Sequence, residues 1–289
     1  MPELPEVEVV KRSLAKKIQN LIIKKVKIND DKLRFRVNKK KILKLEGLRL
    51  KGIERRSKFL IFFFDESYLM LVHLGMTGKF FFVNKSKKMH KTSFYYNIDK
   101  KKDRKHDHII FFLEKKQKLI YNDVRKFGFI KIIKLDDFKS NIHLKYLGPE
   151  PLKKNYNFKY FKKYIKGKKR PVKNLLMDQK FVSGLGNIYV NEVLYLSGVK
   201  PMRKVKNLKN TEIKKIILFT KKILRDAIKF GGSSIKDFST IYGKKGTFQQ
   251  HFRVYGKKGE KCSNTDCNKS IIKINISNRG TFYCSRCQK

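Results

Sequence analysis

The chain has 289 residues, enough for two domains, and 40% of them are hydrophobic, so an ordered core is expected. No apolar run is long enough for a transmembrane helix, and the N-terminus lacks the features of a secretory signal; we therefore expect a cytoplasmic protein. Lysine and arginine number 72 against 24 acidic residues, a net charge of +48 that favours a nucleic-acid partner. Charge alone names no function, because an AT-rich genome would produce part of it and a ribosomal protein would share it.

The first half of the chain is predicted to be β-rich after one N-terminal helix at residues 7–18, where valine, leucine and isoleucine recur at helical spacing. Short apolar or alternating runs follow, separated by turn residues and lysines, a pattern typical of a sandwich or barrel. The very basic stretch 85–105 is predicted to be an exposed loop. The predicted strands cover residues 21–28, 59–64, 68–74, 79–83, 109–113 and 129–133.

A Gly-Pro-Glu-Pro connector at 148–151 separates this half from a helical one, because its two prolines and its glycine disfavour helix. Asn210 or Thr211 would cap the last helix, and the glycines at 231–232 would end it. The predicted helices cover residues 158–165, 172–177, 187–197 and 211–230, and a short cysteine-bearing hairpin follows from about 252.

All four cysteines, Cys262, Cys267, Cys284 and Cys287, lie within the last 28 residues. This clustering argues against scattered disulfides and indicates metal ligands. Two cysteine pairs separated by 16 residues suit tetrahedral Zn²⁺, one ion per chain. The four-residue gap in the first pair departs from the more common two-residue knuckle.

The N-terminus offers a candidate nucleophile. Met1 precedes a small residue, so its removal is expected, and removal exposes the secondary amine of Pro2. An α-amino group has a pKa of about 7.7–8.0, and a neutral secondary amine can form an iminium at a sugar C1′. Glu3 would serve beside it as general acid–base. Proline and acidic residues also favour ordinary helix initiation, so these two residues alone leave both readings open.

A series of short motifs extends from one end of the chain to the other. They are MPELPEVE at 1–8, RRSKFL at 55–60, HLGM at 73–76, KHDH at 105–108, DVRKFG at 123–128, LGPEPL at 147–152, GLGNIY at 184–189, YGKKGE at 255–260 and RGTFYC at 279–284. In identity and order these motifs resemble the formamidopyrimidine-DNA glycosylase family, the bacterial 8-oxoguanine glycosylases.

The resemblance implies an α+β fold with a β-sandwich, an N-terminal helix and a helix–two-turn–helix domain that ends in a zinc β-hairpin. Glycines in 231–251 fit a loop that covers the damaged base. The expected domains are 1–140 for the catalytic sandwich, 141–155 for a hinge, 156–251 for the helix–two-turn–helix domain and 252–289 for the zinc hairpin.

The resemblance also implies a bifunctional DNA glycosylase and AP lyase that excises oxidised purines, namely 8-oxoguanine and formamidopyrimidines. Pro2 would form a Schiff base and Glu3 would act as general acid, and β,δ-elimination would then nick the strand. Lys58 would assist elimination, and Arg279 would hold the phosphate beside the flipped nucleotide. Taken singly, Lys58 and Arg279 are also two ordinary surface charges in a very basic chain.

The same family implies a wedge of Met76, Arg125 and Phe127 that fills the gap left by a flipped base. Taken singly, Met76 and Phe127 also fit a core. The residues expected to bind DNA phosphates are His106, Arg125, Lys168 and Asn187. Of these, Asn187 would equally serve as a plain helix start, and His106 with His108 lacks a third ligand for a metal.

The expected partner is double-stranded DNA with oxidised purines, bound by a monomer in the cytoplasm at the nucleoid. One alternative is an endonuclease VIII-like glycosylase for oxidised pyrimidines, which usually begins Pro-Glu-Gly-Pro where this chain has Leu4. Another is a non-catalytic basic zinc protein that binds DNA or RNA. The intact set of Pro2, Glu3, Lys58 and Arg279 argues against the second alternative.

Overall fold

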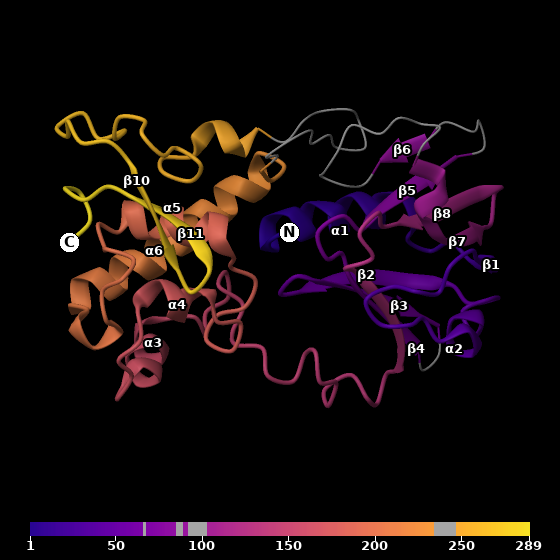
Figure 1. Cartoon of the computed structure of the whole chain (residues 1–289). Helices are drawn as coiled ribbons and strands as arrows, with labels where there is room; N and C mark the ends of the chain where they lie inside the picture. The colour runs from indigo at the N-terminus through magenta and orange to yellow at the C-terminus, as the bar shows by residue number, and fades with distance from the viewer. Residues whose placement is uncertain (66–67, 85–88, 92–102, 234–246) are drawn as a thin grey trace. The chain divides into compact units, whose positions relative to one another are not determined.

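The computed structural model describes residues 1–65, 68–84, 89–91, 103–233 and 247–289 (Figure 1). The chain divides into two compact units, the first formed by Met1–Lys145 with Phe230–Gln249 and the second by Tyr146–Lys229 with Gln250–Lys289. The division falls inside the stretch 141–155.

One segment groups differently from the expected domains. The sequence placed 156–251 in a single helical domain, whereas the described residues 230–233 and 247–249 group with the first unit. Most of the loop predicted to cover the damaged base, residues 234–246, lies outside the described part of the chain. Ser233 donates both its backbone N–H and its hydroxyl to the carboxylate of Glu6, at 2.9 and 3.0 Å. The hydrogen bonds join residues 227 positions apart, so the pattern of neighbouring residues in the sequence could not predict them.

Helix α1 (Leu4–Ile18) opens the first unit and is amphipathic. Its inward stripe of Val7, Val10, Leu14 and Ile18 is buried, which confirms the predicted helix. A short second helix, α2 (Lys39–Leu43), starts at Asn38, whose side chain accepts the N–H of Lys41.

Two antiparallel sheets follow. Phe62 of one sheet and Phe80 of the other pack with their ring centroids 5.8 Å apart inside a shared core, so the predicted β-sandwich is confirmed. The first sheet has the order β1 (Ile23–Ile28), β7 (Asp107–Leu113), β8 (Gln117–Asn122), β5 (Lys79–Val83) and β6 (Met89–Lys91). The second has the order β2 (Leu50–Arg56), β3 (Phe59–Phe64), β4 (Tyr68–His73) and β9 (Phe129–Lys134).

Three strands lie where none was expected. In β2 only Leu50 and Ile53 are buried, so its charged residues hide the alternation. Strand β8 is a short hairpin partner of β7, and β6 lies inside the predicted loop 85–105. That loop prediction is therefore wrong for Met89–Lys91, and residues 85–88 and 92–102 lie outside the described part of the chain.

The second unit contains the four predicted helices, each within one residue of the expected bounds. Phe161 and Phe181 pack edge to face in its core, with ring centroids 4.9 Å apart. Gly148 lies so close to the turn that follows residue 177 that a Cβ at this position would be 2.5 Å from the carbonyl oxygen of Phe181. The helices are α3 (Phe158–Ile165), α4 (Val172–Met177), α5 (Asn187–Leu196) and α6 (Asn210–Lys229).

The chain ends in a two-stranded hairpin, β10 (Ile272–Ile276) and β11 (Arg279–Tyr283). Ser277 and Asn278 both have positive φ, 48° and 57°, as a two-residue hairpin turn of the right-handed twist requires. Short 3₁₀ turns complete the described elements at Asp103–His106, Val205–Asn207 and Phe248–His251.

Candidate active site, wedge loops and metal centre

The first residues of the chain are buried at the start of α1. Glu3 is 3% exposed, and its backbone N–H donates to Oε2 of Glu6 at 2.9 Å in a capping box. Helix initiation is therefore a real role of this segment. The same box holds Pro2 and Glu3 in fixed positions at the chain terminus.

The α-amino group, carried in the structure by Met1, lies in a desolvated and charged environment. Burial lowers the pKa of this amine below 8.0; Glu3 opposes the shift and Lys58 adds to it. The amine expected to react after loss of Met1 is that of Pro2, the next residue along the chain, and the neutral amine is the nucleophilic form. The groups that act on the α-amino group of Met1 thus include Glu3 and Lys58, two of the three charged residues that the sequence assigned to catalysis.

Lys58 lies in the tight turn between β2 and β3 and is only 7% exposed. The turn is tied to α1, because Arg55 donates from Nε to Oε2 of Glu8 at 3.0 Å and from Nη1 to the carbonyl of Ser57 at 2.9 Å. Lys58 is therefore not the solvated surface lysine that chance would favour. The helix that starts at the amine also positions this lysine.

Two loops carry the residues expected to form a wedge. Met76 follows β4 and is 39% exposed, and Phe127 precedes β9 and is 44% exposed, so neither belongs to the core. Arg125 lies with its guanidinium 4.5 Å from the centre of the Phe127 ring. The structure brings these three residues together on two adjoining loops.

Buried hydrogen bonds hold the two loops together. The hydroxyl of Thr77 donates to Asp123 and accepts the backbone N–H of Arg125 at 3.0 Å. Asp123 is fully buried and also accepts the N–H of Gly128 at 2.8 Å. We call this set of bonds the Thr77–Asp123 bracket, which the sequence analysis did not find.

Backbone packing at Gly75 and Gly128 reinforces the bracket. A Cβ on Gly75, whose φ is +60°, would lie 2.4 Å from the backbone of Gly128. A Cβ on Gly128 would lie 2.8 Å from the carbonyl oxygen of His73, where the first loop leaves β4. Both glycines are thus required for the close approach of the loops.

His73 supports the first loop from β4. Its Nδ1 accepts the N–H of Gly75 at 3.1 Å, and its ring stacks on Phe129. Burial and then the charge of Lys58 lower the pKa of His73 to about 4, so the imidazole is neutral near pH 7. A neutral ring can keep Nδ1 as an acceptor, which fixes the path of the loop.

The other predicted DNA contact in the first unit is His106, half-buried in the 3₁₀ turn Asp103–His106. Its carbonyl accepts the N–H of Asp123 at 3.2 Å, which ties it to the bracket. The neighbouring His108 is buried, with Nε2 2.8 Å from the carbonyl of Asp123. In the described parts of the chain, the one cluster with metal-ligand geometry is formed by the cysteines, so His106 and His108 do not form a second.

The remaining predicted DNA contacts lie in the second unit. Lys168 is half-buried after α3, with Nζ 4.7 Å from the ring centre of Tyr164. Asn187 begins α5, and its amide donates to the carbonyl of Gly280 at 2.9 Å. Asn187 thus starts a helix, as the simpler reading held, and also holds the hairpin.

Arg279 is exposed as the first residue of β11, directly after the hairpin turn. Lys173 of α4 was not predicted from the sequence. Its Nζ donates hydrogen bonds to the carbonyl of Gly280, at 3.2 Å, and to the hydroxyl of Thr281. Burial and then the charge of Arg279 lower the pKa of Lys173 to about 8. The one feature of the sequence that could have pointed to Lys173 is its position among the apolar residues of a short helix.

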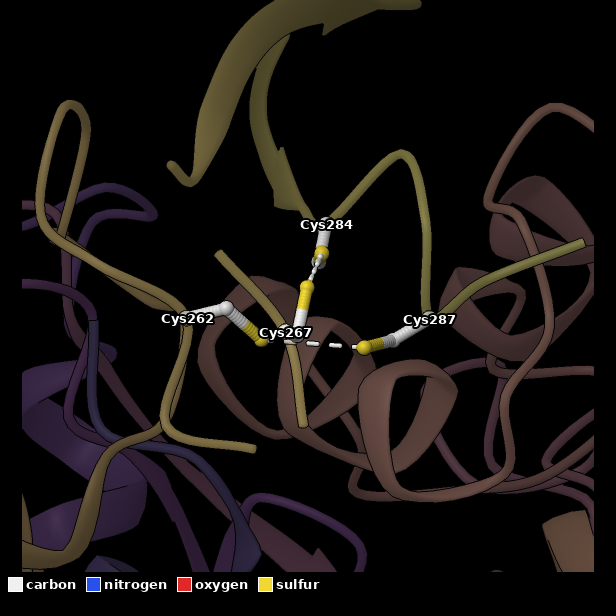
Figure 2. A group of neighbouring side chains, drawn as sticks. All are labelled: Cys262, Cys267, Cys284 and Cys287. Atoms are coloured by element: carbon white, nitrogen blue, oxygen red, sulfur yellow. Dashed lines mark hydrogen bonds between the residues drawn. The ribbon is translucent and has the colours of Figure 1, made fainter. Parts of the chain in front are cut away.

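The four cysteines converge at the base of the hairpin, and their side chains point toward one another (Figure 2). Their sulfur atoms all lie within 4.8 Å of one another; Cys262 and Cys287 are 3.7 Å apart, and Cys267 and Cys284 are 3.6 Å apart. Four thiolates about 2.3 Å from a tetrahedral Zn²⁺ would be roughly 3.8 Å apart. The set therefore fits a metal ion of this kind, in spite of the wider first pair.

Two family models match the chain, both from one class of DNA glycosylase. The formamidopyrimidine-DNA glycosylase N-terminal domain matches residues 1–130, and the H2TH domain of that glycosylase matches residues 147–239. The chain belongs to the formamidopyrimidine-DNA glycosylase family. The predicted family and α+β fold class are thereby confirmed.

Known relatives are similar over the full length. A formamidopyrimidine-DNA glycosylase of Rickettsia bellii is 39% identical over 293 residues, and one of a Ruegeria species is 34% identical over 297, each covering 100% of both chains. A mutant Lactococcus lactis enzyme in complex with Fapy-dG DNA matches with a TM-score of 0.86 and 35% identity over 100% of both chains. The Lactococcus lactis enzyme with abasic-site DNA matches equally well, over 99% of both chains.

Where the structure describes the chain, it contains no helix that is both long enough and apolar enough to cross a membrane.

Proposed function

We propose that the protein is a bifunctional DNA glycosylase and AP lyase of base excision repair that removes oxidised purines, such as 8-oxoguanine and formamidopyrimidines. One observation carries the proposal: the chain terminus lies within the electrostatic influence of Glu3 and Lys58, both of them buried, in a chain of this family. Similar solved structures hold DNA with a formamidopyrimidine or an abasic site, which are a substrate and an intermediate of such a reaction.

Base removal would use the nitrogen of Pro2 after loss of Met1. Its lone pair forms a bond to C1′ while the bond from C1′ to the base breaks, and the departing base takes up a proton. The nitrogen then loses its proton, and its lone pair forms a double bond to C1′ while the C1′–O4′ electrons move onto O4′. Glu3 protonates O4′, and an iminium remains between Pro2 and C1′. Glu3 is 3% exposed and directly follows Pro2 in the chain, so its carboxyl group is the candidate donor of the proton needed at O4′.

Strand cleavage would follow from the iminium, which withdraws electrons from C1′. Loss of a C2′ proton breaks the C3′–O3′ bond and releases a phosphate, and a second elimination breaks C5′–O5′. Lys58 would assist the first elimination. Arg279, held at the hairpin turn, would offer a permanently charged planar group to a phosphate.

The DNA duplex would be distorted by Met76, Arg125 and Phe127, which are exposed on the two bracketed loops. Apolar and planar side chains of this kind can fill the gap left by an extruded nucleotide. The phosphate contacts would be His106, Arg125, Lys168 and Asn187. We expect a monomer that acts on double-stranded DNA in the cytoplasm, at the nucleoid.

The metal would be one Zn²⁺ per chain, held by Cys262, Cys267, Cys284 and Cys287. When bound, a structural zinc contributes folding free energy rather than reaction chemistry. It would keep the hairpin of Arg279 rigid. Elemental analysis of active protein tests this directly, and active protein free of zinc would contradict it.

The proposed activity is tested by borohydride reduction on duplexes that differ in one base. We expect covalent trapping on 8-oxoguanine DNA, less on DNA with an oxidised pyrimidine, and none on undamaged DNA. Stronger trapping on the oxidised pyrimidine would favour the endonuclease VIII-like activity. DNA binding without trapping on any lesion would indicate a non-catalytic protein.

A further inference from the structure

One face of α5 is fastened to the cysteine module, which we define as residues 261–289. Asn187, Asn191 and Tyr195 are spaced four apart and therefore share a helix face. Asn187 donates to the carbonyl of Gly280, and Asn191 Oδ1 accepts the N–H of Phe282 at 2.8 Å. These two residues hold the hairpin strand.

Tyr195, the third residue of this face, reaches the metal centre itself. Its hydroxyl oxygen lies 3.1 Å from Sγ of Cys262 and 3.0 Å from the hydroxyl of Ser263. Its ring is only 8% exposed and packs in the cluster around the cysteines, with Val254 and Ile271. Packing of the ring fixes where the hydroxyl points.

Metal binding determines the direction of these hydrogen bonds. A cysteine that ligates a metal is a thiolate, which accepts hydrogen bonds and cannot donate. The proton of Tyr195 must then point to Cys262. The hydroxyl of Ser263 in turn donates to the oxygen of Tyr195, which gives one chain of donors that ends on the sulfur.

The four-residue gap between Cys262 and Cys267 supplies a second donor. Asn264 closes the loop by accepting the N–H of Cys267 with its carbonyl at 3.0 Å and the N–H of Asp266 with Oδ1 at 3.2 Å. Its remaining side-chain group, Nδ2, donates to Sγ of Cys287 at 3.5 Å. The wider knuckle thus directs an amide at a ligand on the other side of the centre.

We propose that Tyr195, with Ser263 and Asn264, forms an outer shell of donors that holds two of the four thiolates for the metal and fastens the centre to α5. Four thiolates around one divalent ion leave an excess of negative charge, which hydrogen bonds from protein groups stabilise. This inference rests on the proposed zinc site. It gives a role to the unusual first spacing, which the glycosylase reaction leaves unexplained.

The test is the rate at which zinc leaves the intact protein for a coloured chelator. Tyr195→Phe keeps the buried ring and removes the donor, so we expect release about tenfold faster than from the wild type. Tyr160→Phe is the matched control. Tyr160 lies on α3, and its hydroxyl donates to the carbonyl of Phe181 at 2.7 Å rather than to a cysteine. The control should release zinc at the wild-type rate.

Two exposed loop variants guard against a folding defect in Tyr195→Phe. Ser263→Ala and Asn264→Ala leave the core intact, and each should speed release by a smaller factor. Cobalt-loaded protein adds a spectroscopic reading. Removal of a donor raises the energy of the thiolate lone pairs, so the thiolate-to-cobalt charge-transfer band should move to longer wavelength in Tyr195→Phe and stay in place in Tyr160→Phe.

The outcomes separate the two proposals. Wild-type protein without bound zinc would overturn the zinc site and this inference with it. Zinc-loaded wild type with wild-type release and an unmoved cobalt band in Tyr195→Phe would overturn the inference alone. Equal acceleration in Tyr160→Phe would also overturn it, because that result indicates general loosening of the unit.

Discussion

At the scale of single residues, one peptide bond decides whether Pro2 can react. With Met1 attached, the nitrogen of Pro2 is an amide without a basic lone pair; after removal it is a secondary amine. Protein that retains Met1 should therefore give no borohydride-trapped complex on 8-oxoguanine DNA. Processed Pro2→Gly should trap far less than processed wild type, because its primary amine is a poorer iminium former.

Mass spectrometry of the same samples supplies the control for that prediction, since it reports the fraction of chains that begin at Pro2. The trapped yield should rise in proportion to this fraction. Full trapping by protein shown to keep Met1 would remove Pro2 from the mechanism.

A second residue-scale prediction concerns pH. In the structure the α-amino group belongs to Met1; burial lowers its pKa, Glu3 opposes the shift, and Lys58 lowers the pKa further. We expect the amine of processed Pro2, the next residue along the chain, to be subject to the same two charges. The neutral amine is the reactive form, so trapping should persist below pH 8 and fall as the amine becomes protonated. In a plot of trapping rate against pH, this fall forms the acidic limb of the curve. Lys58→Met removes a nearby positive charge, which raises the pKa of the amine and should move the acidic limb to higher pH.

The position of the limb, rather than the rate, is the measured quantity, because Lys58 also has a proposed part in elimination. Lys51→Met is a matched control that removes an exposed charge paired with Asp65 at 2.8 Å. Its limb should coincide with that of the wild type. A limb that moves to lower pH in Lys58→Met would contradict the assigned environment of the amine.

The functional roles of some residues could be predicted from the sequence, and those of others could not. Motifs located Pro2, Glu3 and Arg279 as candidates, because nucleophile and charge types have recognisable spacing in the family. Lys173 and Tyr195 were not predicted, since each acts through contacts to residues far along the chain. Local pattern carries no information on such partners.

At the scale of elements, the Thr77–Asp123 bracket makes two loops behave as one part. Thr77→Val keeps the shape of the side chain and removes the hydroxyl that joins Asp123 to the backbone of Arg125. Loss of a buried hydrogen bond of this kind costs about 1–3 kcal/mol, enough to let the loops separate. We expect excision of 8-oxoguanine to slow by about tenfold, with less effect on trapping at a preformed abasic site.

Fluorescence of 2-aminopurine placed beside the lesion measures the step that the bracket should support, the opening of the base stack. The same substitution at Thr220, a buried threonine of α6, is the control. If Thr77→Val slows excision and abasic trapping equally, the bracket supports the fold in general rather than the wedge.

The predictability of elements follows their burial pattern. Helices such as α6 were assigned within a residue, because amphipathic spacing and end residues agree over 20 positions. Strand β2 was missed because it carries charges on both faces, including Arg55, which is used to brace the Lys58 turn. A strand whose polar residues have tertiary partners lacks the alternation that sequence reading depends on.

At the scale of the whole molecule, the family resemblance gave the two-part fold, whereas composition gave only a polyanionic partner. The hinge role of residues 141–155 stays a prediction, as do the individual DNA contacts. The part that sequence could not supply is the mutual placement of groups, such as the link from Ser233 to Glu6. Such links depend on the folded path of the chain.

The net charge of +48 poses the last question at this scale, namely which cations bind DNA and which reflect composition. Each phosphate contact should add about −0.9 to the slope of log K against log salt concentration. Lys168→Met should therefore make the slope shallower by about one unit and leave lesion preference unchanged.

Lys44→Met is the matched control for Lys168, because each lysine has its ammonium near a tyrosine ring, at 4.7 Å from Tyr164 and 5.5 Å from Tyr68. When a lysine that contacts a DNA phosphate is replaced, one counterion fewer is released on binding, and the slope of log K against log salt concentration becomes shallower. Replacing a lysine that contacts no phosphate changes this slope little. The slope of Lys44→Met should match that of the wild type. Equal changes in both variants would mean that the charge acts collectively, and no change in Lys168→Met would remove this lysine from the interface.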